Sequence, residues 1–179
     1  MKKKELRKQT LEKLKKFTGR KREQAEKELI NKLIQSLEWQ QSSCVALTIA
    51  LPFEINTTFL IHHAWKEKKQ VVVPVIQKNN QMEFHTISPN TKWKDSSFQT
   101  SEPIGEYAIP KEKINFILVP GIVYHEDGYR IGFGKGFYDQ YLTNFHGETA
   151  SLAFSWQINN HWQPEIFDQK VQKIHTSDI

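Results

Sequence analysis

The run from Arg130 to Asp139, RIGFGKGFYD, holds the residue types best suited to chemistry in this chain. Its three alternating glycines let the backbone turn tightly and bring N–H groups close to a ligand. An arginine leads the run, a lysine lies inside it, and an aspartate closes it. Phosphate recognition uses the same parts: backbone N–H groups, fixed positive charge, and an acid that can hold a hard cation. The amphipathic stretch 137–142 follows, so the glycines lead into a helix N-terminus, where an anion is favoured.

Two known glycine motifs match this run poorly. The phosphate loop G-x-x-x-x-G-K-[ST] needs a hydroxyl after its lysine, whereas Gly136 follows Lys135. The dinucleotide fingerprint G-x-G-x-x-G has a different spacing. Glycine spacing alone therefore leaves a structural turn as the alternative, and the three charged residues favour phosphate binding.

The same region resembles a known family. Pro120-Gly121 and the run from Gly128 to Leu142 are similar to the signature of the 5-formyltetrahydrofolate cyclo-ligase family, also called the methenyltetrahydrofolate synthetases. Lys3–Arg7 is similar to the family's K-x-x-L-R opening, and Glu54–Thr57 lies where the family has E-[IV]-[DE]-T. The resemblance covers nearly the whole chain and is most specific in the glycine block.

The resemblance implies a ligase that uses ATP as co-substrate and Mg²⁺ as cofactor. ATP would phosphorylate the formyl oxygen of 5-formyltetrahydrofolate, and N10 of the folate would attack the activated carbon. The products would be 5,10-methenyltetrahydrofolate, ADP and phosphate. Such an enzyme has to hold two anionic ligands in line and exclude water.

The family's functional residues carry over one position at a time. The predicted catalytic residues are Arg130 and Lys135. The predicted ATP-binding residues are Lys3, Arg7, Arg130, Gly132, Gly134, Lys135, Gly136 and Tyr138. The predicted folate-binding residues are Glu54, Phe53 and Met82, and the predicted metal ligand is Asp139.

Each assignment has a structural alternative. The N-terminal cations and Lys135 can be solvated groups, Asp139 can be a first-turn helix acid, and Glu54 can be a loop charge. The apolar candidates can be core residues. Two positions depart from the family pattern: Phe137 stands where a tyrosine is usual, and Asn56 stands where an acid is usual.

Composition favours one domain spanning 1–179, in the cytoplasm. The chain has 179 residues and 38% hydrophobic residues, enough for one compact core. No apolar run approaches the roughly 20 residues of a membrane span, and the basic N-terminus leads into no apolar segment. Cys44 is the single cysteine, which excludes an internal disulfide and suits a reducing compartment.

Positive charge is concentrated at the N-terminus. Residues 1–28 carry a net charge of +7, whereas the whole chain carries +5. The alternative function is therefore a non-catalytic nucleotide- or RNA-binding α/β module that uses this basic region. The other interpretation is a solvated helix face, and we expect a monomer with no nucleic-acid or membrane partner.

Hydrophobic periodicity predicts helices alternating with buried strands. Helices are expected over Glu5–Phe17 and Arg22–Trp39, as a basic region 1–39 packed on the domain, and again after a Thr57 cap. The predicted strands are Cys44–Leu51, Val71–Val73, Met82–Ile87, Phe116–Val119, Thr149–Phe154 and Val171–His175. The polar segment Ser88–Lys113 is either a functional loop or holds short elements. The fold class is thus α/β, with a mostly parallel sheet between helices in three layers.

This arrangement brings the candidate residues together. Glu54 follows the first predicted strand, Gln77 follows the second, and Pro120–Lys135 follows the fourth. Ligands bind beyond the carboxyl ends of parallel strands, so we expect these segments to meet at one edge of the sheet.

Overall fold

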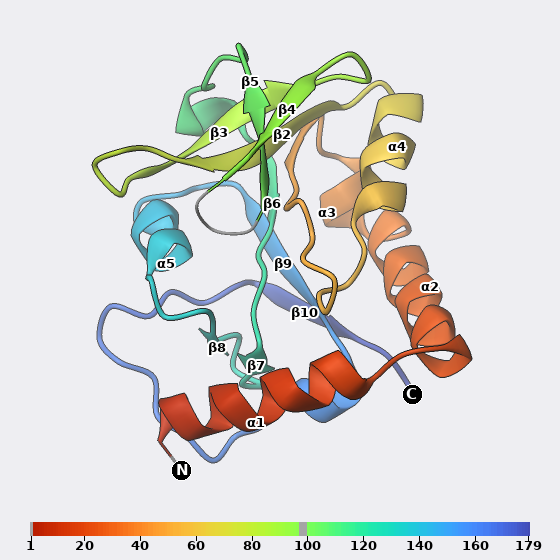
Figure 1. Ribbon diagram of the computed structural model, residues 1–179, viewed down its shortest axis with the longest axis vertical. Helices are drawn as coiled ribbons and strands as arrows, with labels where there is room; N and C mark the ends of the chain where they lie inside the picture. Colours follow the sequence, from red (N-terminus) through yellow and green to blue (C-terminus); the bar gives the residue numbers. More distant parts are fainter. Residues whose placement is uncertain (1, 97–99) are drawn as a thin grey trace.

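The computed structural model describes residues 2–96 and 100–179, built around a six-stranded sheet (Figure 1). The strand order is β10-β9-β6-β1-β2-β3; all neighbours are parallel except β2 and β3. The strands are β1 (Cys44–Ala46), β2 (Gln70–Ile76), β3 (Met82–Ile87), β6 (Phe116–Leu118), β9 (Glu148–Ala153) and β10 (Lys173–Thr176). The predicted mostly parallel sheet is confirmed.

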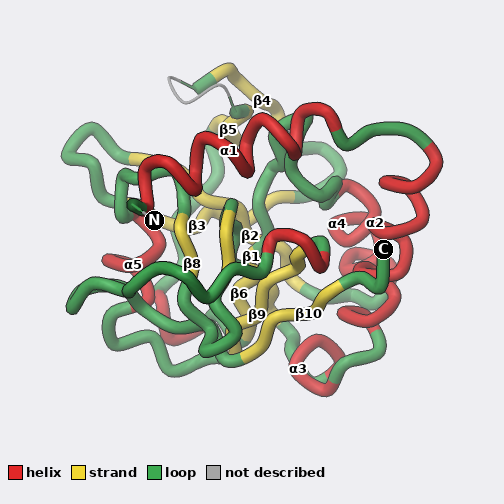
Figure 2. Tube along the Cα trace, turned by 90° about the horizontal axis from the view of Figure 1, so that it is seen from below, coloured by secondary structure: helices red, strands yellow, loops and turns green. Residues whose placement is uncertain are grey.

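Helices cover both faces of this sheet. The helices are α1 (Lys3–Lys16), α2 (Arg20–Ile34), α3 (Leu37–Gln40), α4 (Thr58–Lys66) and α5 (Phe137–Leu142). Figures 1 and 2 show α2 and α4 on one side of the sheet, α5 on the other, and α1 crossing one end. Alternate residues of β2 follow this division: Val71 and Val73 pack with the α2–α4 side, and Val72 packs with Leu142 of α5. The three-layer α/β prediction is therefore confirmed.

Two small hairpins stand outside the main sheet. They are β4 (Lys92–Asp95) with β5 (Ser101–Ile104), and β7 (Val123–Tyr124) with β8 (Arg130–Ile131). Short 3₁₀ turns lie at η1 (Lys111–Lys113) and η2 (Ser155–Gln157). The segment 88–113 thus holds short elements in its described part. The β7–β8 hairpin carries the chain from the end of β6 into the glycine block.

Three predicted boundaries are wrong for identifiable reasons. The strand predicted to run to Leu51 ends at Ala46, because the chain then leaves the sheet to line a cavity. The second predicted helix is broken at Ser36, whose hydroxyl donates to the Leu33 carbonyl (2.6 Å) and accepts from the Trp39 N–H. Strand β2 does not stop at Pro74 but runs through it; its pairing with β1 ends at Val72, so the missing proline N–H removes no bond between them.

The N-terminus of α4 also differs from prediction. The Thr57 hydroxyl does not cap the helix; it donates to the carbonyl of Thr48 at 2.6 Å. Asn56, the residue before this N-cap position, instead accepts with its Oδ1 from the N–H of Thr58, the first residue of the helix, at 2.9 Å. The polar side chain that departs from the family pattern therefore has a local structural role. Among the described residues, no helix is both long enough and apolar enough to cross a membrane.

Candidate active site

A cleft of about 560 Å³ lies between the glycine block and the start of α1. It is lined by every residue of 130–139, together with Lys3, Lys4, Arg7, Pro120, Glu165, Phe167 and Asp168. All residues predicted to bind ATP are in this set, and so is Asp139. The tertiary structure thus gathers the N-terminal cations and the glycine block, more than 120 positions apart, around one space.

Arg7 holds the glycine block against α1. Its Nε donates to the carbonyl of Gly132 at 2.7 Å. Gly134 has a φ of +94°, and a Cβ built there would lie 3.4 Å from the Arg7 guanidinium. A side chain at this position would be strained and would press on Arg7. A Cβ at Gly132 would meet open space, so of these two positions only Gly134 has a local geometry that requires glycine.

Arg130, predicted to bind phosphate, and Asp139, predicted to bind the metal, form an ion pair with each other. The Nη2 of Arg130 lies 3.1 Å from Oδ1 of Asp139, and the arginine is 5% exposed. Gln169 fixes both partners: its carbonyl accepts from Arg130 Nη1 at 2.8 Å, and its N–H donates to Asp139 Oδ1 at 3.0 Å. Both contacts to the aspartate, from Arg130 Nη2 and from the Gln169 N–H, use Oδ1, so Oδ2 is the oxygen that remains to face a ligand.

The fit of this site to Mg²⁺ rests on Asp139. Within residues 2–96 and 100–179, no cluster of three or more histidine, cysteine or acidic side chains forms a metal cage. Magnesium that arrives with a nucleotide needs only one or two carboxylates, because phosphates and waters complete its octahedron. Asp139 lines the cleft apart from Glu165 and Asp168, which lie beside Lys3, so its carboxylate fits this ion.

A second group of charges at the cleft was missed by the sequence analysis. Lys3 Nζ lies 2.5 Å from Asp168 Oδ2, 3.6 Å from Glu165 Oε1, and over the ring of Trp162. Lys3 and Asp168 are 165 positions apart. The segment 165–168 belongs to no motif that the sequence analysis identified, so no local signal was available to place it in this cleft.

A mostly apolar cavity of about 270 Å³ adjoins the cleft. Its lining comes from the loop after β1, the end of β2, the β5 region, Pro120 and the glycine block: Thr48, Ile49, Leu51, Glu54, Pro74, Ile76, Thr100, Ser101, Pro120, Phe133, Lys135, Phe137 and Tyr138. Segments that follow β1 and β6 do meet at one edge of the sheet; Gln77, expected there after the second strand, is not in this lining. The last five residues line the larger cleft as well, so the two spaces share a wall.

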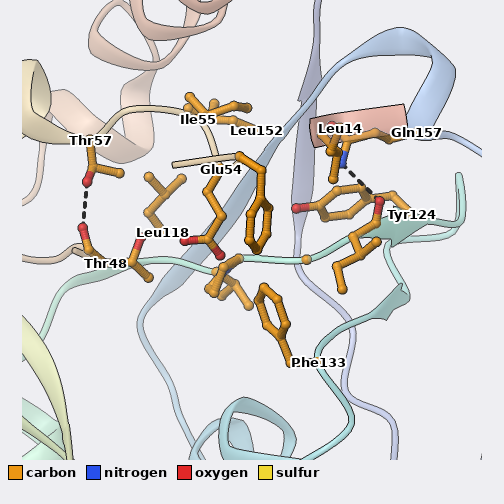
Figure 3. Close-up of a pocket in the computed structure, with 15 residues that line it drawn as sticks. Leu14, Thr48, Glu54, Ile55, Thr57, Leu118, Tyr124, Phe133, Leu152 and Gln157 are labelled. Atoms are coloured by element: carbon orange, nitrogen blue, oxygen red, sulfur yellow. Dashed lines mark hydrogen bonds between the residues drawn. The ribbon is translucent and has the colours of Figure 1, made fainter. Parts of the chain in front are cut away.

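Glu54 presents its carboxylate inside the protein, between the sheet and the glycine block (Figure 3). Its Oε2 accepts from the Leu51 N–H at 2.7 Å. Burial raises the pKa of Glu54, and this hydrogen bond opposes the shift. A buried carboxylate with acceptor capacity left is suited to a flat ligand with paired N–H donors.

The two other predicted folate contacts lie differently. Phe53 lines a small neighbouring cavity of about 50 Å³ with Glu54, and its ring centroid is 6.0 Å from that of Phe133. Met82 is buried in the cluster on the α5 side and lines a separate hollow beside Tyr141. Met82 is thus not brought together with Glu54, and its folate contact stays a prediction.

Tyr138 lies in the wall shared by the two spaces. Its hydroxyl is buried and has no hydrogen-bond partner among residues 2–96 and 100–179. Burial raises the pKa of Tyr138 far above its usual range; the charge of Glu54 adds to the shift and that of Arg130 opposes it. The hydroxyl therefore keeps its proton and can act only as a neutral hydrogen-bonding group.

Comparison with known proteins points the same way as this geometry. Residues 1–177 match the model of the 5-formyltetrahydrofolate cyclo-ligase family. A 5-formyltetrahydrofolate cyclo-ligase from Haemophilus influenzae is 27% identical over 164 residues, covering 85% of this chain and 88% of the relative. The mouse 5-formyltetrahydrofolate cyclo-ligase is 28% identical over 166 residues, covering 84% and 81%.

Solved structures agree in fold. The solution structure of the Aquifex aeolicus 5,10-methenyltetrahydrofolate synthetase superposes with a TM-score of 0.88 at 29% identity, covering 100% of this chain and 91% of that one. The Mycoplasma pneumoniae 5,10-methenyltetrahydrofolate synthetase has a TM-score of 0.81 at 21% identity, covering 97% and 98%. The second likeness supports the fold alone.

Proposed function

This chain belongs to the 5-formyltetrahydrofolate cyclo-ligase family, and on that premise we propose that its two adjoining spaces form one active site for ATP and 5-formyltetrahydrofolate. The chain is an enzyme of the cyclo-ligase type, converting 5-formyltetrahydrofolate to 5,10-methenyltetrahydrofolate. The main support for this proposal is that the two spaces share a wall, because a phosphoryl group can pass directly only between ligands that are in contact.

The proposed reaction has two steps. The formyl oxygen attacks the γ-phosphorus of ATP; a new P–O bond forms, and the bond to the bridging oxygen breaks as ADP leaves with its electron pair. N10 then attacks the formyl carbon, N10 loses its proton, and the C–O bond breaks with release of phosphate. The protein supplies no nucleophile in this scheme, so its contribution is positioning and charge stabilisation.

The cleft supplies the charge that the first step requires. Lys135 lines both spaces, at the place where the transferred phosphoryl group would lie. Arg130, Arg7 and the N–H groups of the glycine block face the same nucleotide. Asp139 would hold Mg²⁺, which neutralises phosphate charge when bound.

The apolar cavity suits the flat pterin ring. Glu54 would accept hydrogen bonds from the ring N–H and amino groups, and the aromatic side chains of Phe133 and Phe137 would exclude water. Phe137, which stands where the family usually has a tyrosine, lines both spaces and presents an apolar ring surface without a hydroxyl group. Asn56 is engaged at the start of α4 and does not line either space.

We also propose that the enzyme is a monomeric, single-domain protein of the cytoplasm. One chain supplies both spaces. Leu6 and Leu14 of α1 and Leu29 of α2 share a buried cluster with the sheet, which supports one domain over 1–179. Cys44 is a buried free thiol, as suits a reducing compartment.

A turnover assay tests the function directly. Purified protein with 5-formyltetrahydrofolate should produce the methenyl chromophore only when ATP and a divalent metal are both present, with one ADP and one phosphate per product. Lys135→Ala should lower ATP-dependent efficiency about ten- to hundred-fold, by losing a charge-assisted contact of roughly 1.5–3 kcal/mol. Lys8→Ala, which removes an exposed cation of α1 outside the cleft lining, should change little. Turnover without ATP would contradict the cyclo-ligase reaction. Salt-sensitive binding to RNA with no turnover would favour the alternative module.

A further inference from the structure

We propose that Arg22 is a positioning residue for Glu54, fixing the loop that presents this carboxylate to the folate. The inference rests on the proposed role of Glu54. Arg22 lies on α2, lines neither of the two spaces and is 9% exposed. A buried arginine requires partners for its donors, and the identity of those partners reveals its role.

The guanidinium group of Arg22 joins three separate segments. Nη2 donates to the carbonyl oxygen of Glu54 at 2.6 Å. Nη1 donates to the carbonyls of Phe17 at 3.1 Å and Leu14 at 3.4 Å. Nε lies 2.9 Å from Oε1 of Glu26, one turn along α2. The last contact stays within α2, whereas the others tie α2 to α1 and to the loop after β1.

The contact with Glu54 acts on a turn that is closed upon itself. The Glu54 N–H donates to the carbonyl of Leu51 at 2.9 Å, and the Leu51 N–H donates to the Glu54 carboxylate at 2.7 Å. The direction of the carboxylate is therefore set by the orientation of the whole 51–54 turn. Arg22 holds that turn by its last carbonyl, so it determines where the carboxylate points without touching the ligand.

Arg22 also contacts α1, so it links the Glu54 loop to a second element of the site. The carbonyls of Leu14 and Phe17 lie at the C-terminal end of α1, where carbonyls lose helical partners; that of Leu14 keeps a bond from the Phe17 N–H at 3.3 Å. The opposite end of this helix carries Lys3 and Arg7 into the nucleotide cleft. Arg22 thus fixes the position of the Glu54 loop relative to α1, the helix that contributes to ATP binding.

Arginine is suited to this position for a geometric reason. Its planar fork presents donors in several fixed directions, whereas a lysine ammonium is a single point of charge on a flexible stem. Arg22→Lys keeps the charge beside Glu26 but cannot reach all three carbonyls in the same way. Arg22→Met keeps most of the apolar stem and removes every donor.

The test measures two affinities on each folded variant: 5-formyltetrahydrofolate without nucleotide, and a non-hydrolysable ATP analogue without folate. Arg22→Met should weaken folate binding about tenfold, the value of a lost charge-assisted hydrogen bond, and weaken the ATP analogue less than about threefold. Glu26→Gln is the matched control; it removes the ion pair within α2 and should change both affinities less than about twofold.

A double-mutant cycle separates positioning from general stability. In the Glu54→Gln background, Arg22→Met should weaken folate binding less than about twofold further, because the carboxylate it positions is already altered. Additive effects, or equal losses for both ligands, would overturn the proposal. If Arg22→Met does not fold, Arg22→Lys enters the same cycle with the same two outcomes. An inactive wild-type protein would refute the proposed function, whereas an active one with an additive cycle refutes only the role of Arg22.

Discussion

Arg130 and Asp139 form an ion pair of 3.1 Å inside the cleft between the glycine block and α1, nine positions apart in the same glycine block. One partner is predicted to bind phosphate and the other magnesium. Without a ligand, each neutralises the charge that the other would leave buried. The cleft is therefore organised in the ligand-free protein, and the nucleotide and metal of the proposed function would have to satisfy both partners.

Asp139→Asn tests the acid of this pair. The amide keeps the shape but loses the negative charge, so a higher magnesium concentration should be needed for half-maximal activity at saturating ATP and folate. Arg130 would also lose its ion-pair partner, so the free energy of unfolding should fall by about 1–3 kcal/mol. Magnesium titrations of activity, with thermal unfolding beside them, check both effects; an unchanged magnesium dependence would place the metal elsewhere.

Gly134 and Gly132 give a matched comparison within the loop. Gly134→Ala places a Cβ at a φ of +94° and 3.4 Å from the Arg7 guanidinium, so it should destabilise the protein by about 1–2 kcal/mol. Gly132→Ala meets open space and should leave stability nearly unchanged. Both changes should raise the KM for ATP, because each adds a side chain beside the phosphates. Denaturant unfolding of both variants measures the difference in stability. Equal stabilities would contradict the strain expected for a side chain at position 134.

Glu54→Gln should weaken folate binding by about 1–3 kcal/mol and leave ATP affinity nearly unchanged, because one acceptor oxygen becomes a donor that faces a pterin donor. Ligand titrations of the same folded protein check this. Equal weakening of both ligands, or no effect on folate, would show that Glu54 does not hold the pterin.

The raised pKa of Glu54 also predicts a pH effect. In the folded ligand-free protein the carboxyl binds its proton more tightly than in the unfolded chain, whose pKa is near 4.5. Stability from this group is therefore present below that value and is lost as the pH rises through the raised folded pKa. Glu54→Gln should remove this loss, so its stability relative to wild type should increase from acid to neutral pH. Denaturant unfolding of both proteins over that pH range checks the sign of this change. A constant difference between their free energies of unfolding would contradict the pKa shift.

Tyr138→Phe should separate stability from catalysis. The hydroxyl is buried with no partner in the described part of the chain, so its removal should leave the melting temperature unchanged or raised. If the hydroxyl finds its partner in the bound ligands at the shared wall, kcat should fall by about three- to tenfold, near 1 kcal/mol. Tyr141→Phe, on the same helix but beside a separate hollow, is the control and should leave kcat unchanged. Wild-type kcat in Tyr138→Phe would assign this tyrosine to packing alone.

Local patterns in the sequence determined much of this protein. Amphipathic spacing predicted α1 and most of α2, and alternation predicted β3 with the bounds that the structure has. The glycine block could be recognised as a candidate ligand-binding loop because its parts lie within ten consecutive residues, and short-range geometry follows from local residue type. Strand continuation through Pro74 was missed, because it depends on where the neighbouring strand ends.

Tertiary structure alone decided how the site is assembled. Lys3 meets Asp168 across 165 positions, and Arg22 reaches the carbonyl of Glu54 from a different layer. Met82 and Glu54 were both predicted to contact the folate, and the sheet register places Met82 in the cluster on the α5 side. No spacing rule encodes such contacts, because they arise from the packing of whole elements whose buried surface, summed over the core, outweighs any single polar contact.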